Sequence, residues 1–181
     1  MQTISTVFTD KGVVVPVRNE ADSLYQDGFG SRLTDSRLLV LGPVEVLFLV
    51  ERLKIAVIDE GRRERIVFRE LLLRFSEEDP LIWTRYIVYR DLRTRGFVVK
   101  SGDGEGVNFL AYERGAYGKR KPRYFIHTIW EGSPEPIRRL TERLSEAEAS
   151  DRILRLAVVD RRGEVVYYTL SEMDFPEAGD A

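Results

Sequence analysis

Two kinds of spacing between apolar residues organise the N-terminal half of the chain. Over the first forty residues, short β-rich runs such as 13–15 and 38–41 alternate with turn residues, which predicts short strands of a small sheet. The pattern changes at Gly42-Pro43, where a proline at a first helical position precedes a dense apolar run. This arrangement is typical of a mostly buried helix, and a second helix is expected over residues 64–75.

The polar segment 76–80 ends one apolar pattern and precedes another. Because domain boundaries fall in exposed polar segments, we predict an N-terminal α/β domain over residues 1–78 and a C-terminal domain over residues 79–176. The last residues, 177–181, are expected to form a frayed tail.

The C-terminal half is expected to open with a helix that begins at Pro80, is capped by Asp79 and stops at Gly96. The same rules assign the following segments to strands at 97–100, 107–113 and 124–130, a helix signalled by Ser133-Pro134 and ending near Ser150, and a hairpin of residues 152–159 and 164–170. The order αβββαββ predicts a mixed sheet with helices against it. We therefore expect an α/β fold (α+β, with mixed sheets).

The composition limits the kinds of functional site that this chain can form. The 181 residues are 43% hydrophobic, which is enough for a real core, and 28 basic against 30 acidic side chains give a net charge of -2. Attraction to a polyanion must therefore come from local patches. With no cysteine and one histidine, disulfides, thiolate metal sites and a clustered zinc or iron site are not expected, so we predict no metal and no cofactor.

The chain also lacks the patterns that address a protein to a membrane. Its N-terminus has no basic region followed by an apolar run, and no stretch approaches the ~20 apolar residues that span a bilayer. We expect a soluble, intracellular protein of the cytoplasm that makes no membrane contact.

A basic segment in the C-terminal half is the first candidate for a functional site. It covers residues 114–123, contains no acid, and has tyrosines at 112, 117 and 124 within or beside it. Its five cations are Arg114, Lys119, Arg120, Lys121 and Arg123. Such a loop can bind phosphates with its cations and stack bases on its rings, although charge alone is more typical of a solvated surface loop.

Two other features have simpler interpretations. The glycine-rich run 102–106 is interpreted as a turn, because Asp103 and Glu105 would repel an anion. His127 shares a strand face with Phe125 and Ile129, which favours a packed, hydrogen-bonded imidazole over a catalytic one.

Taken together, several spaced motifs resemble the archaeal tRNA-splicing (tRNA-intron) endonucleases. The motifs that carry the resemblance occur in the order Leu41–Leu49, Tyr89–Gly102, Val107–Gly115, Tyr124–His127 and Leu156–Asp160. The similarity covers nearly the whole chain from residue 41 onward, and it is most specific in residues 86–115 and 152–168.

The resemblance implies a small N-terminal α/β domain, a C-terminal nuclease-like α/β domain, and an assembly of four such units that recognises the bulge-helix-bulge shape of precursor tRNA. It also implies a metal-independent cut in which the substrate's own 2′-hydroxyl attacks and leaves a 2′,3′-cyclic phosphate. That reaction needs a base, an acid and a cation for the phosphate. Family members supply them as Tyr, His and Lys.

This chain departs from the family pattern at these three positions. Glu105 matches the Tyr, and Arg152 matches the Lys. The position of the His falls on Lys121 when counted back from the Tyr124 motif, and near Lys119 when counted forward from Glu105. Ser145 stands where family members carry an arginine that sandwiches a bulge base.

The three departures have two explanations within the family, an active variant and a structural subunit, and a third hypothesis lies outside the family. Glu105, Lys121 and Arg152 could run the reaction as a variant set, but losing three roles at once favours release from catalysis. The resemblance then implies a structural subunit that pairs with a homologous catalytic chain, two plus two, on precursor tRNA. A stand-alone RNA-binding module that contacts RNA through the basic loop is the alternative of a different class.

A non-catalytic subunit still has to assemble. Strand 165–170 is apolar on both faces, which suits burial against another chain, and its interface candidates are Val165, Tyr167 and Leu170. In the family the hairpin turn before this strand is an acidic loop that docks into a basic groove across the assembly, and here it offers Asp160 and Glu164. Arg161 and Arg162 interrupt its acidity, and an ordinary hairpin turn is the alternative.

Overall fold

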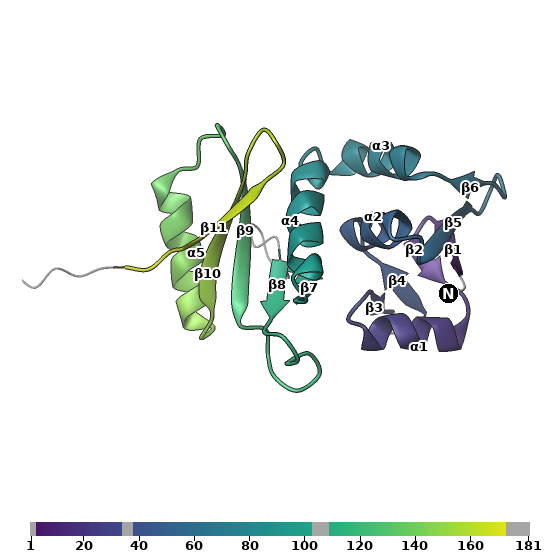
Figure 1. The fold of residues 1–181 in the computed structure, drawn as a ribbon, viewed down its shortest axis with the longest axis horizontal. Helices are drawn as coiled ribbons and strands as arrows, with labels where there is room; N and C mark the ends of the chain where they lie inside the picture. The colour runs from purple at the N-terminus through teal and green to yellow at the C-terminus, as the bar shows by residue number, and fades with distance from the viewer. Residues whose placement is uncertain (1–2, 34–37, 103–108, 173–181) are drawn as a thin grey trace, which may run out of the picture.

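The structure, a computed structural model, describes residues 3–33, 38–102 and 109–172. Figure 1 shows two sheets with α4 (Ile82–Thr94) between them, and this helix packs against α2 (Pro43–Glu51) on one side and against the C-terminal sheet on the other. The expected α/β architecture with two mixed sheets, one in each half of the chain, is confirmed.

Within the described residues, the N-terminal sheet has six strands in the order β3-β4-β2-β1-β5-β6. Its strands are β1 (Ile4–Thr9), β2 (Gly12–Val15), β3 (Ser31–Arg32), β4 (Leu39–Leu41), β5 (Ile55–Asp59) and β6 (Arg65–Ile66). The sheet is mixed because β1 runs parallel to β5 and antiparallel to β2. The helices of this half are α1 (Arg18–Gln26), α2 and α3 (Phe68–Glu78).

Helix α2 is the central element of the core, as its dense apolar run predicts. It begins after Gly42 with Pro43 at its first position, and its residues 44–50 are all buried. One of these buried residues is charged: Glu45 accepts the backbone N–H of Gly42 at 2.8 Å and that of Gly30 at 3.0 Å. The carboxylate therefore caps its own helix and fixes the turn that follows α1.

The C-terminal sheet has five strands among the residues that the structure describes, in the order β11-β10-β9-β8-β7. They are β7 (Val98–Ser101), β8 (Phe109–Tyr112), β9 (Tyr124–Trp130), β10 (Ile153–Val159) and β11 (Val165–Thr169), and α5 (Ile137–Ala149) lies between β9 and β10 in the chain. Strands β9 and β10 are parallel and all other neighbours antiparallel. The predicted order αβββαββ is confirmed.

The two faces of this sheet belong to different clusters of apolar side chains. The α4 face, with residues such as Ala111 and Ile126, continues the core of the N-terminal half. The other face, with Phe125 and Leu154, packs under α5 in a smaller cluster. Strands β8, β9 and β10 therefore alternate between two apolar layers, as β-strand geometry allows.

Several predicted boundaries are wrong for physical reasons. Helix α1 and strand β5 were not predicted. The second helix begins at Phe68, because Arg65-Ile66 pair with β5 instead. Helix α4 begins at Ile82: Asp79 accepts the N–H of Leu81 at 3.0 Å, so Pro80 precedes the helix.

Other expectations fall where the structure gives no test. The domain boundary after residue 78 stays a prediction. The frayed tail 177–181 and most of the glycine-rich run 102–106 lie outside the described residues. None of the helices in the described part of the chain combines the length and apolar character that a membrane span needs.

Candidate nucleic-acid interface

Strand register brings three polar side chains to one end of the C-terminal sheet. Ala111 of β8 pairs with Tyr124 of β9, which pairs with Ile153 of β10. The backbone N–H of Arg123 donates to the carbonyl of Ala111, and that of Ile153 to the carbonyl of Arg123, both at 3.0 Å. Tyr112, Arg123 and Arg152 are each one position further toward this end. By alternation all three belong to the face that carries α5.

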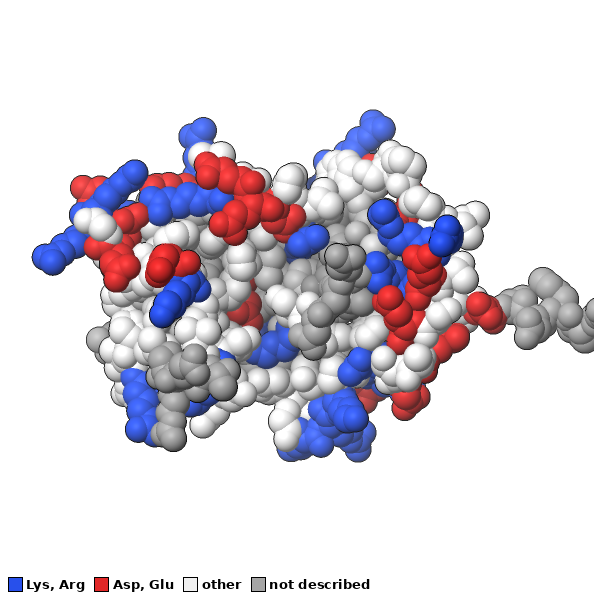
Figure 2. Space-filling view, turned by 180° about the vertical axis from the view of Figure 1, so that it is seen from behind, with Lys and Arg blue, Asp and Glu red and all other residues white. Residues whose placement is uncertain are grey.

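The basic loop hangs from the same end of the sheet, between β8 and β9 (Figure 1). Backbone bonds shape it, since Lys119 and Arg120 both donate to the carbonyl of Ala116 at 3.0 and 2.9 Å. All five of its cations are exposed: Arg114, Lys119, Arg120, Lys121 and Arg123. Figure 2 shows Lys and Arg gathered at the lower edge of the molecule, where this loop lies.

Acidic side chains do little to neutralise this loop. Arg123 lies 3.9 Å from the carboxylate of Asp151, and within the described residues the other four cations have no carboxylate within 4.0 Å. The predicted cluster is thus a cationic, solvent-facing surface, which is the arrangement that binds phosphates.

Of the three positions matched to the family's catalytic residues, two lie together here. The Nε of half-buried Arg152 donates to the carbonyl of Pro122 at 3.2 Å, and its guanidinium lies 4.9 Å from the centre of the Phe125 ring. Arg152 therefore holds the segment that carries exposed Lys121. Glu105 lies outside the described residues.

Tyr112, which the sequence placed beside the basic loop as a ring for stacking bases, is also a member of this group. It ends β8, and its ring meets Tyr117 edge to face with centroids 5.1 Å apart. Only the pairing of β8 with β9 and of β9 with β10 reveals that its phenol shares an end and a face with Arg152, so the chain pattern alone could not place it beside that residue.

The single histidine lies away from this end of the sheet. His127 is four residues further along β9 than Arg123, which at ~3.3 Å per residue is about 13 Å away. It is 7% exposed, and its Nε2 lies 3.3 Å from the carboxylate of Glu135. The predicted packed and bonded imidazole is confirmed.

A cluster of rings and charges ties the basic loop to the N-terminal half. The Tyr117 hydroxyl donates to the carbonyl of Tyr25 at 3.4 Å, and the Nζ of Lys100 lies 5.7 and 5.8 Å from the centres of these two rings. Lys100 also donates to the carbonyl of Gly30 at 2.7 Å and lies 4.0 Å from the carboxylate of Glu45. Burial raises the pKa of the Glu45 carboxyl and lowers the pKa of the Lys100 ammonium.

The hairpin between β10 and β11 differs in detail from its prediction. Asp160 accepts the N–H groups of Arg162 and Glu164, both at 2.8 Å, so its carboxylate shapes the turn while Glu164 stays exposed. Tyr167 points inward, and its hydroxyl donates to Asp91 at 2.8 Å. Val165 also packs on the main core, and Leu170 packs on the smaller cluster.

The apolar side chains that β11 exposes are ones the sequence reasoning did not name. Val166 and Tyr168 are 50% and 54% exposed. In the described sheet β11 is an edge strand, so its outer backbone groups are open to pairing as well.

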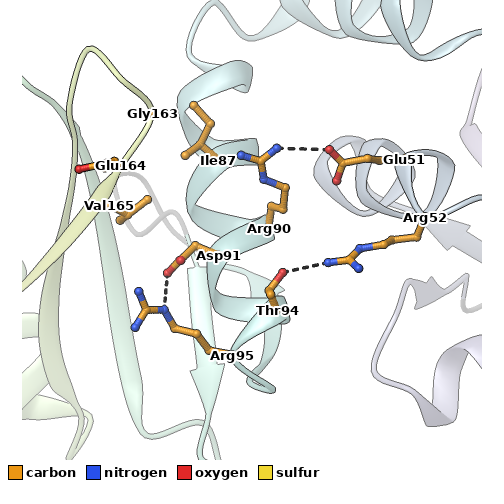
Figure 3. Close-up of a pocket in the computed structure, with 10 residues that line it drawn as sticks. All are labelled: Glu51, Arg52, Ile87, Arg90, Asp91, Thr94, Arg95, Gly163, Glu164 and Val165. Carbon is orange, nitrogen blue, oxygen red and sulfur yellow. Dashed lines mark hydrogen bonds and ion pairs between the residues drawn. The ribbon is translucent and has the colours of Figure 1, made fainter.

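Two grooves lie where the halves of the chain meet. One, of about 740 Å³, runs between the end of α2, helix α4 and the hairpin (Figure 3). Four of its charges form two pairs: Arg90 lies 3.2 Å from Glu51, and Arg95 lies 2.7 Å from Asp91.

The second groove, of about 470 Å³, is basic. Arg52, Lys54 and Arg93 line it together with aromatic rings, and Asp27 is the acid among its described lining residues. The Arg93 guanidinium lies 4.0 Å from the centre of the Phe29 ring and uses one N–H on the carbonyl of Asp27. Such a groove suits an acidic segment. Among all the residues that the structure describes, no three His, Cys, Asp or Glu side chains come together in a way that could hold a metal ion.

Comparison with known proteins matches both halves of the chain. The family model described as the tRNA intron endonuclease N-terminal domain matches residues 4–72, and that described as the tRNA intron endonuclease catalytic C-terminal domain matches residues 82–167. Together they cover most of the described residues.

Similar proteins include several called tRNA-splicing endonuclease. The one from Thermococcus gammatolerans is 32% identical over 87% of this chain and 91% of its own length. That from Methanococcus maripaludis is 30% identical over 93% of this chain and 94% of its length. That from Methanococcoides burtonii is 33% identical over 87% of this chain, which spans 44% of that longer protein.

Proposed function

Since this chain belongs to the tRNA intron endonuclease family, we propose that it is a subunit of a tRNA-splicing endonuclease that removes introns from precursor tRNA in the cytoplasm, at bulge-helix-bulge motifs. Its own role in this proposal is structural: it supports assembly and RNA positioning, while a homologous chain carries the catalytic Tyr, His and Lys. The observation that carries the proposal is the set of groups at the sheet end, a phenol, an ammonium and guanidiniums, with the one imidazole about 13 Å away.

This set of groups lacks the acid that the family uses. Attack by the 2′-hydroxyl needs a base for its proton and an acid for the 5′-oxygen that leaves. The family's acid is a His, whereas the described residues at this end of the sheet offer a phenol, lysines and arginines, and arginine stays protonated throughout. The sheet end therefore suits holding a phosphate better than cleaving beside it.

A catalytically active variant is the second candidate, and Tyr112 favours it. Its phenol stands at the same end and face as Arg152, where a base for the 2′-hydroxyl would be needed. In that candidate Lys121 is the acid and Arg152 binds the phosphate, with Glu105 in support. It requires the exposed ammonium of Lys121, in place of an imidazole, to protonate the 5′-oxygen that leaves.

The proposed assembly uses the edge strand β11 and the hairpin that precedes it. The edge strand β11, with exposed Val166 and Tyr168, would pair this chain side by side with its homologous partner. Glu164 at the hairpin tip, with Asp160 behind it, would dock into a basic groove of the opposite pair, giving a two plus two heterotetramer. The groove lined by Arg52, Lys54 and Arg93 is the surface this chain offers in return.

The test is cleavage of a minimal bulge-helix-bulge RNA by the purified chain, alone and after mixing with a homologous chain that carries Tyr, His and Lys. We expect no 2′,3′-cyclic phosphate product from the chain alone and full cleavage from the mixture. Product from the chain alone, free of any partner, would replace the structural role by the active variant. A chain that binds RNA equally well with and without partner, and never enters a complex, would instead be a stand-alone RNA-binding module.

A further inference from the structure

A small apolar pocket of about 200 Å³ opens on the α4 face of the C-terminal sheet, on the opposite side from α5. Its floor and walls are made by Leu92, Phe97, Ala111, Tyr124, Ile126 and Tyr167. The floor is deeply buried, and the rings of Phe97 and Tyr124 meet edge to face with centroids 6.3 Å apart. These rings give the pocket the flat aromatic walls on which planar groups stack.

Two arginines line the pocket, Arg95 and Arg155, and a third, Arg114, lies over the ring of the lining residue Phe97. Arg95 lies 5.6 Å from the centre of Tyr167, Arg155 lies 5.4 Å from Tyr124, and Arg114 lies 5.4 Å from Phe97. Cation–π contacts thus hold the guanidiniums of Arg95 and Arg155 at the pocket and that of Arg114 beside it.

Two of these cations lack an acidic partner. Arg95 is paired with Asp91 at 2.7 Å, whereas Arg114 and Arg155 have no carboxylate within 4.0 Å in residues 3–33, 38–102 and 109–172. Arg155 donates to the hydroxyl of Thr169, which is neutral. The rim therefore carries positive charge that the described residues leave uncompensated, above an apolar floor.

We propose that this pocket binds one unpaired nucleotide of RNA, with its base against Phe97 and Tyr124 and its phosphate on Arg155 and Arg114. An aromatic platform beside guanidiniums matches both parts of a nucleotide, because a base stacks on rings and a phosphate accepts charge-assisted hydrogen bonds from arginine. This inference rests on the proposed role in RNA binding.

Charge and continuity favour RNA over a protein segment as the occupant. An apolar segment of a second copy would cover the two unpaired guanidiniums without neutralising them, which is unfavourable. Arg114 also belongs to the basic loop, so one cation of that loop lies beside the pocket, over the ring of its lining residue Phe97. A strand of RNA that crosses this end of the sheet can reach both.

The experiment uses the full chain and a five-nucleotide single-stranded RNA with 2-aminopurine at its centre, because the fluorescence of this base changes when it stacks. We expect a saturable fluorescence change, and binding weakened about tenfold by Arg155→Met or by Phe97→Leu. Arg69→Met is the matched control: Arg69 is exposed on α3, away from the pocket, and its loss should change binding less than twofold. Circular dichroism verifies the fold of each variant, and Arg155→Met keeps the test valid should Phe97→Leu unfold.

Three results would overturn the inference. One is a wild-type chain that leaves the fluorescence unchanged, and another is pocket variants that bind as the control does. The third is an Arg155→Met variant that alters sedimentation of the chain, which would mean that a second copy covers the pocket. The proposed function fails separately: absence from any endonuclease complex would end it even where the pocket binds the probe.

Discussion

The basic loop offers the sharpest quantitative test of RNA contact. Replacing Lys119, Arg120 and Lys121 by glutamine removes three exposed cations and keeps chains of similar length. The backbone bonds that shape the loop do not involve these side chains, so its conformation should persist. We expect weaker binding of a bulge-helix-bulge RNA and, more specifically, a shallower dependence of affinity on salt.

The magnitude follows from counterion release. Each phosphate contact contributes about -0.9 to the slope of log K against log salt on a duplex and about -0.7 on a single strand, so three contacts contribute about -2.1 to -2.7. Between 50 and 200 mM salt, the wild-type chain should lose affinity about 20- to 40-fold more than the triple variant does. Fluorescence anisotropy over this salt range measures both slopes.

A matched control removes the same charge elsewhere. Arg62, Arg63 and Arg65 are exposed around the β5–β6 hairpin of the N-terminal half, and replacing these three by glutamine also lowers the charge by three. The control should leave the salt slope within about 0.5 of the wild type. Equal slopes for the two triple variants, or a loop variant with the wild-type slope, would refute phosphate contact by the loop.

Three further predictions concern catalysis, assembly and stability. In the complex with a catalytic homologue, Tyr112→Phe and Arg152→Ala should each leave the cleavage rate within about threefold, whereas a loss of about 10²-fold with assembly intact would assign them catalytic roles. Glu164→Lys should split the four-chain particle into pairs in light scattering at moderate salt, because it places like charges in the proposed dock; a particle that stays intact would make the tip an ordinary turn. Asp59 accepts backbone N–H groups of the following turn and lies 2.9 Å from Arg74, and these contacts lower the pKa of its carboxyl. The ionised carboxylate therefore stabilises the fold above the unfolded pKa of 3.8, and this contribution is lost as the pH falls through the folded pKa. Asp59→Asn should therefore melt at a lower temperature than wild type at pH 7, and this gap should narrow as the pH falls below 3.8; a gap that stays equal at low pH would contradict this linkage.

The elements that could be predicted from the sequence are those whose own residues determine them. Strand β9 runs from Tyr124 to Trp130 as predicted, because its apolar alternation is unbroken and a basic loop and a proline-containing turn bound it. Helix α2 begins at Pro43 as predicted, since proline and a dense apolar run favour one structure together. Helix α1 was missed because only Ala21 and Leu24 of its residues are buried, which leaves too few apolar positions to show a helical period.

The missed boundaries show tertiary structure overriding local pattern. Residues 65–66 continue an apolar pattern into α3, yet Ile66 pairs with Val57 of β5, and this contact is invisible until the strand partner is known. The exposed side of β11 was missed for a related reason. Alternation reveals two faces but not which of them meets α4, so the exposed pair Val166 and Tyr168 could not be separated from the inward Val165 and Tyr167.

The site itself illustrates the limit of counting residues between motifs. Counting back from the Tyr124 motif gives Lys121, counting forward from Glu105 gives Lys119, and the two disagree because loop length is not a fixed quantity. Strand register has no such freedom: the backbone bonds that join Arg123 to Ala111 and to Ile153 place Arg152 beside Arg123 and bring Tyr112 to the same end. A phenol that no count selected therefore becomes the neighbour of the one matched residue that is half-buried. The choice between structural and active subunit then depends on whether this end supplies an acid as well as the phenol of Tyr112, and the described residues there offer cations for a phosphate but no imidazole.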